Sequence, residues 1–230
     1  MKTKDKQLYL YEEAMLLALR DEKGTVMTSF PDQVVAGAVL AELLLDGRIS
    51  VEDNKKQLVD ALHDGQVGDP VMDECLEKIA SSKRRASVRT WVSRLAGIKH
   101  LRHRVAQQLC ERGILRADED KILLVFKRKI YPEINSQPER RIISRLREAI
   151  FTDRRQLDPR TVVLISLADG AGLLAQNFGR KEIKARKKRI EQIASGDLLG
   201  RTTRDVIAAC QTALIVAAVM PAIVSTTVHN

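Results

Sequence analysis

Three basic residues lie close together near the middle of the chain, at spacings that would place them on one flank of a helix. Lys99, Arg102 and His103 fall within a helical pattern that runs from residue 98 to residue 111. At about 100° of rotation per residue, their side chains would lie within about 100° of each other around that helix. An arginine can donate two parallel hydrogen bonds to a phosphate, and a lysine adds a mobile point charge. The spacing therefore predicts that these residues bind one anionic group, and a solvated basic face is the alternative interpretation.

The segment around these residues has a strong local excess of positive charge. Residues 81–110 contain eight lysines and arginines and no aspartate or glutamate. The whole chain has a formal net charge of +9, yet residues 1–80 hold nine basic and sixteen acidic side chains, so the rest of the chain carries a net charge of +16. Such a basic region indicates an anionic partner, which on charge alone is a nucleic acid, a membrane surface or another protein.

A second basic group lies beside apolar residues further along the chain. Lys127, Arg128 and Lys129 are followed directly by Ile130 and Tyr131. An apolar tip between basic side chains is typical of segments that touch a membrane, because each lysine or arginine contributes about 1 kcal/mol on an anionic leaflet. These five residues are therefore predicted to contact a membrane. The alternative is a hairpin that packs on the domain or on a partner.

The chain lacks the sequence patterns of common catalytic and metal sites. It contains no G-x-S-x-G elbow, P-loop, H-E-x-x-H or C-x-x-C pattern. His100 and His103 are three residues apart, but no nearby acid or thiol completes a metal-binding set. The adjacent carboxylates Glu12 and Glu13 are interpreted as a solvated helix face. We therefore predict no catalytic residues, no metal site, no cofactor and no enzymatic activity.

The cysteines and the chain ends indicate a cytoplasmic protein. Cys75, Cys110 and Cys210 are an odd number without close spacing, which favours reduced thiols in the core. Residues 1–7 lack the apolar stretch of a secretory signal. The apolar run 206–224 is interpreted as a buried helix rather than a membrane span, because polar residues and a proline interrupt it.

Nucleic-acid binding through the basic C-terminal two-thirds of the chain is the alternative function. Aromatic residues make up only 3% of the chain, which is too few for a platform that stacks single-stranded bases. No helix-turn-helix is recognisable. Binding to duplex DNA would therefore rest on phosphate contacts and would depend steeply on salt.

Helical periodicity dominates the chain and predicts a mainly α fold. Apolar residues recur at helical spacing in eight segments, which are residues 8–17, 34–45, 72–79, 88–95, 98–111, 138–151, 159–175 and 180–194. We expect a single globular domain with a central helical bundle, surrounding amphipathic helices and a small β-hairpin. The domain is predicted to span residues 8–224, with tails at 1–7 and 225–230.

One region has the pattern of paired strands instead. Short apolar runs at 113–115 and 122–126 flank an acidic segment at 118–120. Two apolar runs divided by a polar turn predict a β-hairpin, with extended chain continuing to Pro132.

Six segments form a pattern whose order and spacing are specific. They are Leu8-Tyr-Leu-Tyr-Glu-Glu-Ala-Met-Leu-Leu-Ala-Leu, Ala41-Glu-Leu with Asp46-Gly-Arg-Ile, Gly68-Asp-Pro-Val-Met-Asp-Glu-Cys-Leu, Val88-Arg-Thr-Trp-Val, Arg102-His-Arg-Val-Ala with Leu109-Cys-Glu-Arg-Gly-Ile-Leu, and Asp158-Pro-Arg-Thr-Val-Val-Leu-Ile-Ser-Leu-Ala. Through these segments the chain resembles the Golgi phosphoprotein 3 family, and the resemblance runs from about residue 8 to residue 218.

The resemblance implies a compact, mainly helical fold with a hairpin that contributes to self-association and membrane contact. It also implies binding of phosphatidylinositol 4-phosphate, and hence peripheral membrane association of a cytoplasmic protein. For eukaryotic members it implies an adaptor role that retains glycosyltransferases in the Golgi by binding their cytoplasmic tails. The partners it implies are therefore anionic phospholipid, tails of membrane proteins and further copies of the chain.

The resemblance also implies which residues bind the lipid head group. The family pocket is built from a tryptophan and an arginine near the second helix and two basic residues on a later helix. The two basic residues match Lys99 and Arg102, with His103 beside them. The tryptophan position falls in the loop 29–32 and the arginine position is Ala36, so two of the four pocket elements have no counterpart here. An attraction to anionic lipid that is less selective for the inositol head group is the resulting expectation.

Overall fold

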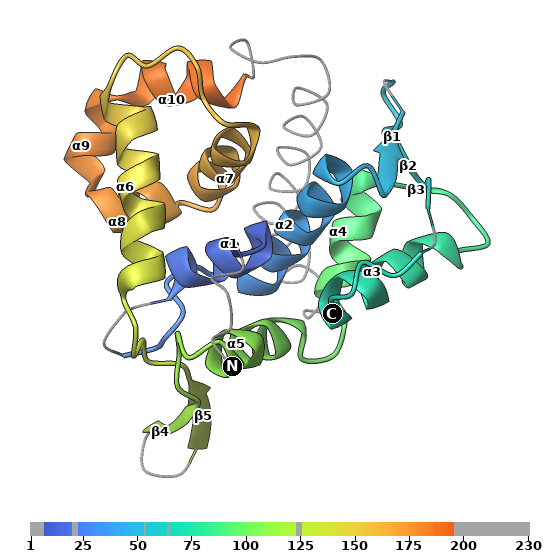
Figure 1. The fold of residues 1–230 in the computed structure, drawn as a ribbon, viewed down its shortest axis with the longest axis horizontal. Coiled ribbons are helices and arrows are strands. Elements are labelled where there is room, and N and C mark those ends of the chain that lie inside the picture. The colour runs from blue at the N-terminus through green and yellow to red at the C-terminus, as the bar shows by residue number, and fades with distance from the viewer. Residues whose placement is uncertain (1–6, 20–22, 53, 64, 123–125, 196–230) are drawn as a thin grey trace, which may run out of the picture.

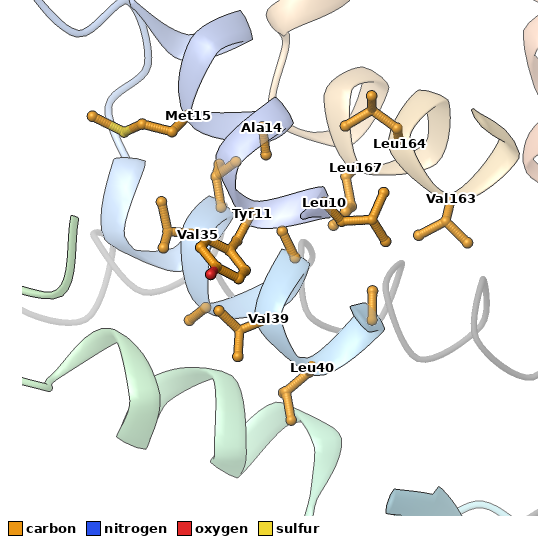
Figure 2. Packing of buried hydrophobic residues seen from close by; sticks show 14 of the residues in the cluster. Leu10, Tyr11, Ala14, Met15, Val35, Val39, Leu40, Val163, Leu164 and Leu167 are labelled. Carbon is orange, nitrogen blue, oxygen red and sulfur yellow. The ribbon is translucent and has the colours of Figure 1, made fainter. Parts of the chain in front are cut away.

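Two apolar helices lie at the centre of the fold. The computed structural model describes residues 7–19, 23–52, 54–63, 65–122 and 126–195, and only the backbone of residues 121, 122, 126 and 127. Helix α1 (Leu10–Ala18) is buried along its whole length, and α2 (Pro31–Leu45) is buried at every position from Val34 to Leu44. A helix that is apolar all round must be covered on all sides. Figure 1 shows α1 and α2 crossing the middle of the molecule, and Figure 2 shows the Tyr11 ring between them, beside Val35 and Val39.

A third central helix and several amphipathic helices complete the bundle. Helix α7 (Pro159–Gly170) is buried at residues 161–168 and packs against α1, α2 and α10. The helices around these three central helices are α3 (Pro70–Ala80), α4 (Val88–Ala96), α5 (Leu101–Glu111), α6 (Gln137–Phe151), α8 (Leu173–Phe178), α9 (Arg180–Ala185) and α10 (Lys187–Ala194). Most of them bury one side only, as α3 does with Val71, Met72, Cys75, Leu76 and Ile79. The predicted mainly α fold with a central bundle is confirmed.

A small three-stranded sheet lies at the end of α2 and was not predicted as a sheet. Strands β1 (Ile49–Val51), β2 (Leu58–Ala61) and β3 (Ala86–Ser87) pair in antiparallel order, with Ser50 opposite Asp60 and Val59 opposite Ala86. The strands are two to four residues long, which is too short for alternation to be recognised in a sequence.

A hairpin in this region is confirmed, but its strands are not the predicted runs 113–115 and 122–126, and the predicted turn at 118–120 is wrong. Strands β4 (Asp118–Ile122) and β5 (Phe126–Ile130) pair antiparallel, so the acidic residues 118–120 begin a strand. They do so because basic residues lie opposite two of them: Glu119 faces Lys129, and Asp120 accepts a 2.7 Å hydrogen bond from Arg128. Such cross-strand pairs stabilise an antiparallel ladder. The hairpin projects from the helices at the lower edge of Figure 1.

Two predicted helices are each divided in the structure. Gly172, which has a left-handed φ of +71°, separates α7 from α8, and Arg186 separates α9 from α10. The predicted buried helix at 206–224 lies outside the described residues, as does Cys210, and the predicted domain bounds stay a prediction. None of the helices that the structure describes is long and apolar enough to cross a bilayer.

Candidate functional site

The turn between α4 and α5 differs from the sequence prediction. Helix α5 begins at Leu101 and not at residue 98, because His100 has a left-handed backbone with φ of +60°. A left-handed residue interrupts the helical hydrogen-bond pattern. Ile98 packs against the core from the turn, which explains why it fitted the apolar stripe. Lys99 therefore lies in the turn and Arg102 in the first turn of α5, so the helical angle between them does not hold.

Four side chains from α5, its preceding turn and β5 gather into what we call the α5 cationic cluster: His100, Arg102, His103 and Lys129. The His100 and His103 rings have centroids 6.0 Å apart. Burial lowers the pKa of His103, and the positive fields of Arg102, Lys129 and His100 lower it further, while Asp32 opposes them. The cluster therefore concentrates positive charge from two elements that are distant in sequence.

Asp32 is the carboxylate that forms an ion pair with Arg102 of this cluster. Its Oδ1 atom lies 3.9 Å from Arg102 Nε, and the two side chains are 39% and 32% exposed. A pair this open to solvent contributes about 0–1 kcal/mol. Asp32 also lies in the first turn of α2, where the helix dipole stabilises a negative charge. Arg102 is therefore only loosely neutralised.

Lys99 lies in a separate pocket beside α4. The pocket has a volume of about 500 Å³, and Lys99 lines it together with Trp91, Arg94, Lys78 and Glu74. The Arg94 guanidinium carbon is 4.9 Å from the centre of the Trp91 ring, a distance typical of a cation–π contact. The structure thus places Lys99 in the pocket over Trp91 and Arg102 in the α5 cationic cluster, instead of on one helix flank.

The residues predicted to touch a membrane have different environments. Lys129 and Arg128 are exposed, Ile130 is half-buried, and the side chain of Lys127 lies outside the described residues. Tyr131 is only 6% exposed, which disagrees with its predicted contact with a membrane. Its hydroxyl lies 2.9 Å from His103 Nδ1 and so fixes the base of the hairpin to α5.

An exposed isoleucine adds an apolar group near the hairpin base. Ile134 is 58% exposed, and its N–H donates to the carbonyl oxygen of Ile114. The exposed basic residues of β5 and this side chain lie a few residues apart in the chain. Together they supply the apolar and basic groups that a membrane-contact segment requires.

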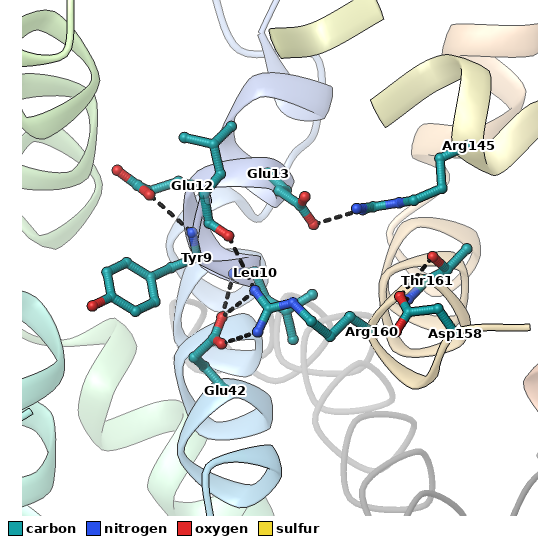
Figure 3. Close-up of polar contacts among 10 residues, drawn as sticks. Tyr9, Leu10, Glu12, Glu13, Glu42, Arg145, Asp158, Arg160 and Thr161 are labelled. Carbon is teal, nitrogen blue, oxygen red and sulfur yellow. Dashed lines mark hydrogen bonds and ion pairs between the residues drawn. The ribbon is translucent and has the colours of Figure 1, made fainter. Parts of the chain in front are cut away.

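The interpretation of Glu12 and Glu13 as a solvated face is wrong. They are only 2% and 3% exposed. Glu12 is paired with Arg112 at 2.7 Å. Glu13 is paired with Arg145 at 2.8 Å, as Figure 3 shows. These partners are 100 and 132 residues away in the chain. No local sequence signal could have identified them.

A pocket of about 620 Å³ lies over the same carboxylates, between α1, α5 and α6. Its lining includes Glu12, Glu13, Arg112 and Arg145, together with Gln108. The lining also includes Asp69, Glu111 and Arg141, so charges of both signs line the pocket and it favours no single sign of ligand charge.

Metal binding finds no support in the described part of the chain. Within it, no three His, Cys, Asp or Glu side chains lie close enough together to hold an ion. Cys75 is buried and its pKa is raised to about 12, chiefly by desolvation, so its thiol stays protonated near neutral pH.

Comparisons with known proteins give a consistent result. The family model described as Golgi phosphoprotein 3 (GPP34) matches residues 10–210. The chain is also similar to "Vacuolar protein sorting-associated protein 74" of Eremothecium gossypii, with 24% identity over 222 residues, which cover 81% of this chain and 66% of the relative. The match therefore spans slightly less than two thirds of the relative's length.

Proposed function

Because the chain belongs to the Golgi phosphoprotein 3 family, we propose that it is a peripheral membrane protein that binds the head group of an anionic phospholipid. The α5 cationic cluster is the observation that carries this proposal. Phosphatidylinositol 4-phosphate is the head group that the resemblance suggests. Family membership does not favour the alternative of nucleic-acid binding.

The charge of the cluster supports contact with an anion. Arg102 and Lys129 bring two fixed positive charges to His103, whose pKa is lowered first by burial and then further by their repulsion. A phosphate placed among them would relieve that repulsion and accept charge-assisted hydrogen bonds from Arg102. Lys99 lies three residues before Arg102 and extends the basic surface toward the pocket over Trp91. We therefore propose Lys99, Arg102 and His103 as head-group contacts, with Lys129 added to them.

The hairpin supports membrane contact and self-association. Its exposed basic residues and the exposed Ile134 combine electrostatic attraction with an apolar group. Strands β4 and β5 form a sheet of two strands, and each has an outer edge that can pair with another chain. Adaptor binding to tails of membrane proteins rests on family membership alone.

Removing the two fixed charges of the cluster should weaken membrane binding. The variant R102A/K129A is expected to lose about tenfold to thirtyfold in affinity for anionic vesicles, since each basic residue at the membrane surface contributes about 1 kcal/mol. The measurement is flotation with phosphatidylcholine vesicles that contain phosphatidylinositol 4-phosphate, phosphatidylserine or no anionic lipid. Adding K99A measures whether the pocket over Trp91 belongs to the same contact surface.

The matched control removes two charges elsewhere. Lys181 and Lys188 are exposed on α9 and α10, so K181A/K188A changes the net charge equally. Arg186 is not used as a control position, because its guanidinium donates a 2.6 Å hydrogen bond to the carbonyl of Phe151 at the end of α6, and its replacement would remove this contact as well as the charge. Equal losses in the two variants would mean diffuse attraction and contradict a defined site. No binding of the wild-type protein to any anionic vesicle at physiological salt would contradict the proposed function.

Neutralising Asp32 should have the opposite effect. The variant D32N is expected to bind anionic vesicles about twofold to fivefold more tightly, because the carboxylate no longer competes for Arg102. The control E77Q removes one exposed carboxylate of α3 and should leave the affinity near that of the wild type. If D32N and E77Q change the affinity equally, Asp32 acts only through net charge.

A further inference from the structure

His103 lies where α5 meets the base of the hairpin. Its Nδ1 atom is 2.9 Å from the hydroxyl of Tyr131, and the two ring centroids are 5.8 Å apart. Tyr131 is buried, and its N–H donates a 3.0 Å hydrogen bond to the carbonyl oxygen of Gly24, so both its backbone and its ring are held. The imidazole of His103 is therefore fixed at Nδ1, while Nε2 remains the ring nitrogen that can serve a ligand.

Charged groups face His103 from three elements. Arg102 and His100 come from the start of α5, Lys129 comes from β5, and Asp32 comes from α2. The first three carry or can carry positive charge, and burial also disfavours a charged ring. The pKa of His103 is lowered from its ordinary value of 6.5, so the ring is neutral near pH 7 in the absence of a ligand. An anion bound beside it would reverse that balance.

We propose that His103 makes the lipid site selective for a phosphomonoester over a phosphodiester, by taking up a proton from solvent when the ligand binds, and that Tyr131 positions the ring for this role. The inference rests on the proposed lipid-binding function. A phosphodiester carries one negative charge, which Arg102 and Lys129 already balance. A phosphomonoester carries about −1.5 to −2 near pH 7, and its additional charge favours the imidazolium.

Tyr131 suits both protonation states of the ring. A phenol hydroxyl can donate to Nδ1 of a neutral imidazole and can accept from the Nδ1–H of an imidazolium. The hydrogen bond therefore persists when the ring takes up a proton. In the imidazolium, Nε2 carries a hydrogen as well and can donate it to a phosphate oxygen.

The sign of the pH dependence follows from the higher pKa of His103 in the bound state. As the pH falls from the pKa of His103 in the bound state toward its pKa in the free state, protonation of His103 increasingly strengthens the binding of a phosphomonoester. The strengthening is lost as the pH rises again. The ligand itself takes up a proton near pH 6, which opposes this gain. Comparing the wild type with H103Q at each pH cancels the titration of the ligand, because both proteins meet the same lipid.

The first test measures vesicle binding at about pH 6.5 and pH 8. Vesicles of phosphatidylcholine contain one of two anionic lipids. Phosphatidylinositol 4-phosphate carries a phosphomonoester on its head group, whereas phosphatidylserine has only the phosphodiester. The ratio of wild-type to H103Q affinity is expected to rise about fivefold from pH 8 to pH 6.5 for the monoester and to stay constant for the diester. The control H63Q removes an exposed histidine outside the α5 cationic cluster and should keep the pH dependence of the wild type.

The second test follows the proton directly. In two-dimensional proton–carbon spectra, the His103 signal is identified by its absence in H103Q, and its pKa is measured with and without inorganic phosphate. The pKa should rise when phosphate is added. Y131F keeps the buried ring but removes the hydroxyl, and it should weaken binding to monoester vesicles more than binding to phosphatidylserine vesicles.

The outcomes separate this inference from the proposed function. If the wild type binds neither vesicle, the proposed function fails. If it binds both but the ratio to H103Q does not change with pH, or changes equally for both lipids, the role of His103 is overturned. A rise in the pKa with inorganic phosphate but no preference among vesicles would overturn the lipid as the ligand, because the site would then serve soluble phosphates.

Discussion

Replacing Arg160 with methionine should lower the free energy of unfolding by about 3–5 kcal/mol near pH 7, because the change leaves a buried carboxylate without its cation. Glu42 is 1% exposed and is paired with Arg160. The Nη2 atom of Arg160 also lies 3.1 Å from the Leu8 carbonyl oxygen, and the Leu10 N–H donates to Glu42 (Figure 3). The pair therefore holds the start of α1 against α2 and α7. Chemical unfolding with urea measures the loss.

The loss in R160M should depend on pH. Burial already raises the pKa of Glu42, while the hydrogen bonds from Arg160 and from the Leu10 N–H lower it. Without the guanidinium, the pKa rises further, and the folded state takes up a proton that the unfolded state lacks. A carboxyl group whose pKa is higher in the folded state than in the unfolded state increases the free energy of unfolding as the pH falls toward its pKa in the unfolded state. The difference in unfolding free energy between wild type and R160M should therefore narrow from pH 8 to pH 5.

A double variant tests the physical cause. R160M/E42Q replaces the carboxylate with an amide that can still accept from the Leu10 N–H, so it should be more stable than R160M near pH 7. A double variant no more stable than R160M would show that Arg160 acts through its packing and not through its charge.

Replacing Gly24 with alanine should be the other strongly destabilising change, with a loss of at least about 2 kcal/mol in unfolding free energy. Gly24 has a φ of +56°, and a Cβ atom there would lie 2.2 Å from Pro132 N and from the Tyr131 carbonyl carbon. These are backbone atoms, so no side-chain rotation relieves the overlap. The Gly24 carbonyl also accepts the N–H of Tyr131, so the change should loosen the base of the hairpin.

Gly47 provides a matched control. It has a similar φ of +64°, but a Cβ atom at this position would meet nothing within 4 Å. G47A therefore measures the cost of the backbone conformation alone, which is about 1 kcal/mol. G24A should lose clearly more stability than G47A, and its Tyr131 amide should exchange hydrogen faster. Equal losses in unfolding free energy would show that the backbone at the hairpin base shifts to accommodate the Cβ atom without destabilising the fold.

The central helices could be predicted well because their signal is local. The apolar stretch of α2, interrupted only by Glu42 between residues 34 and 45, and the apolar residues of α7 recur within each helical turn, so neighbouring residues alone define these helices. Asp158 before Pro159 also predicts the start of α7, and the Asp158 carboxylate does accept from the Thr161 N–H. These features depend on residues three or four positions apart.

The errors arise where distant partners decide the structure. The acidic residues 118–120 looked like a turn, but basic residues across the ladder make them a strand. Glu12 and Glu13 looked solvated, but arginines from α5 and α6 bury and pair them. His100 adopts a left-handed backbone, which no pattern of residue types in this segment indicated, and it moved Lys99 out of the predicted helix.

The amino-acid sequence by itself determined the mainly helical fold, the hairpin, the strongly basic region and the family to which the chain belongs. Only the tertiary structure decided which charged groups lie near each other: it placed Lys99 before the start of α5, joined His103 to Tyr131 across 28 residues, and brought Lys129 near His103. The reason is physical, because helical periodicity depends on neighbours within one turn, whereas an electrostatic field and a hydrogen bond depend on distance through space.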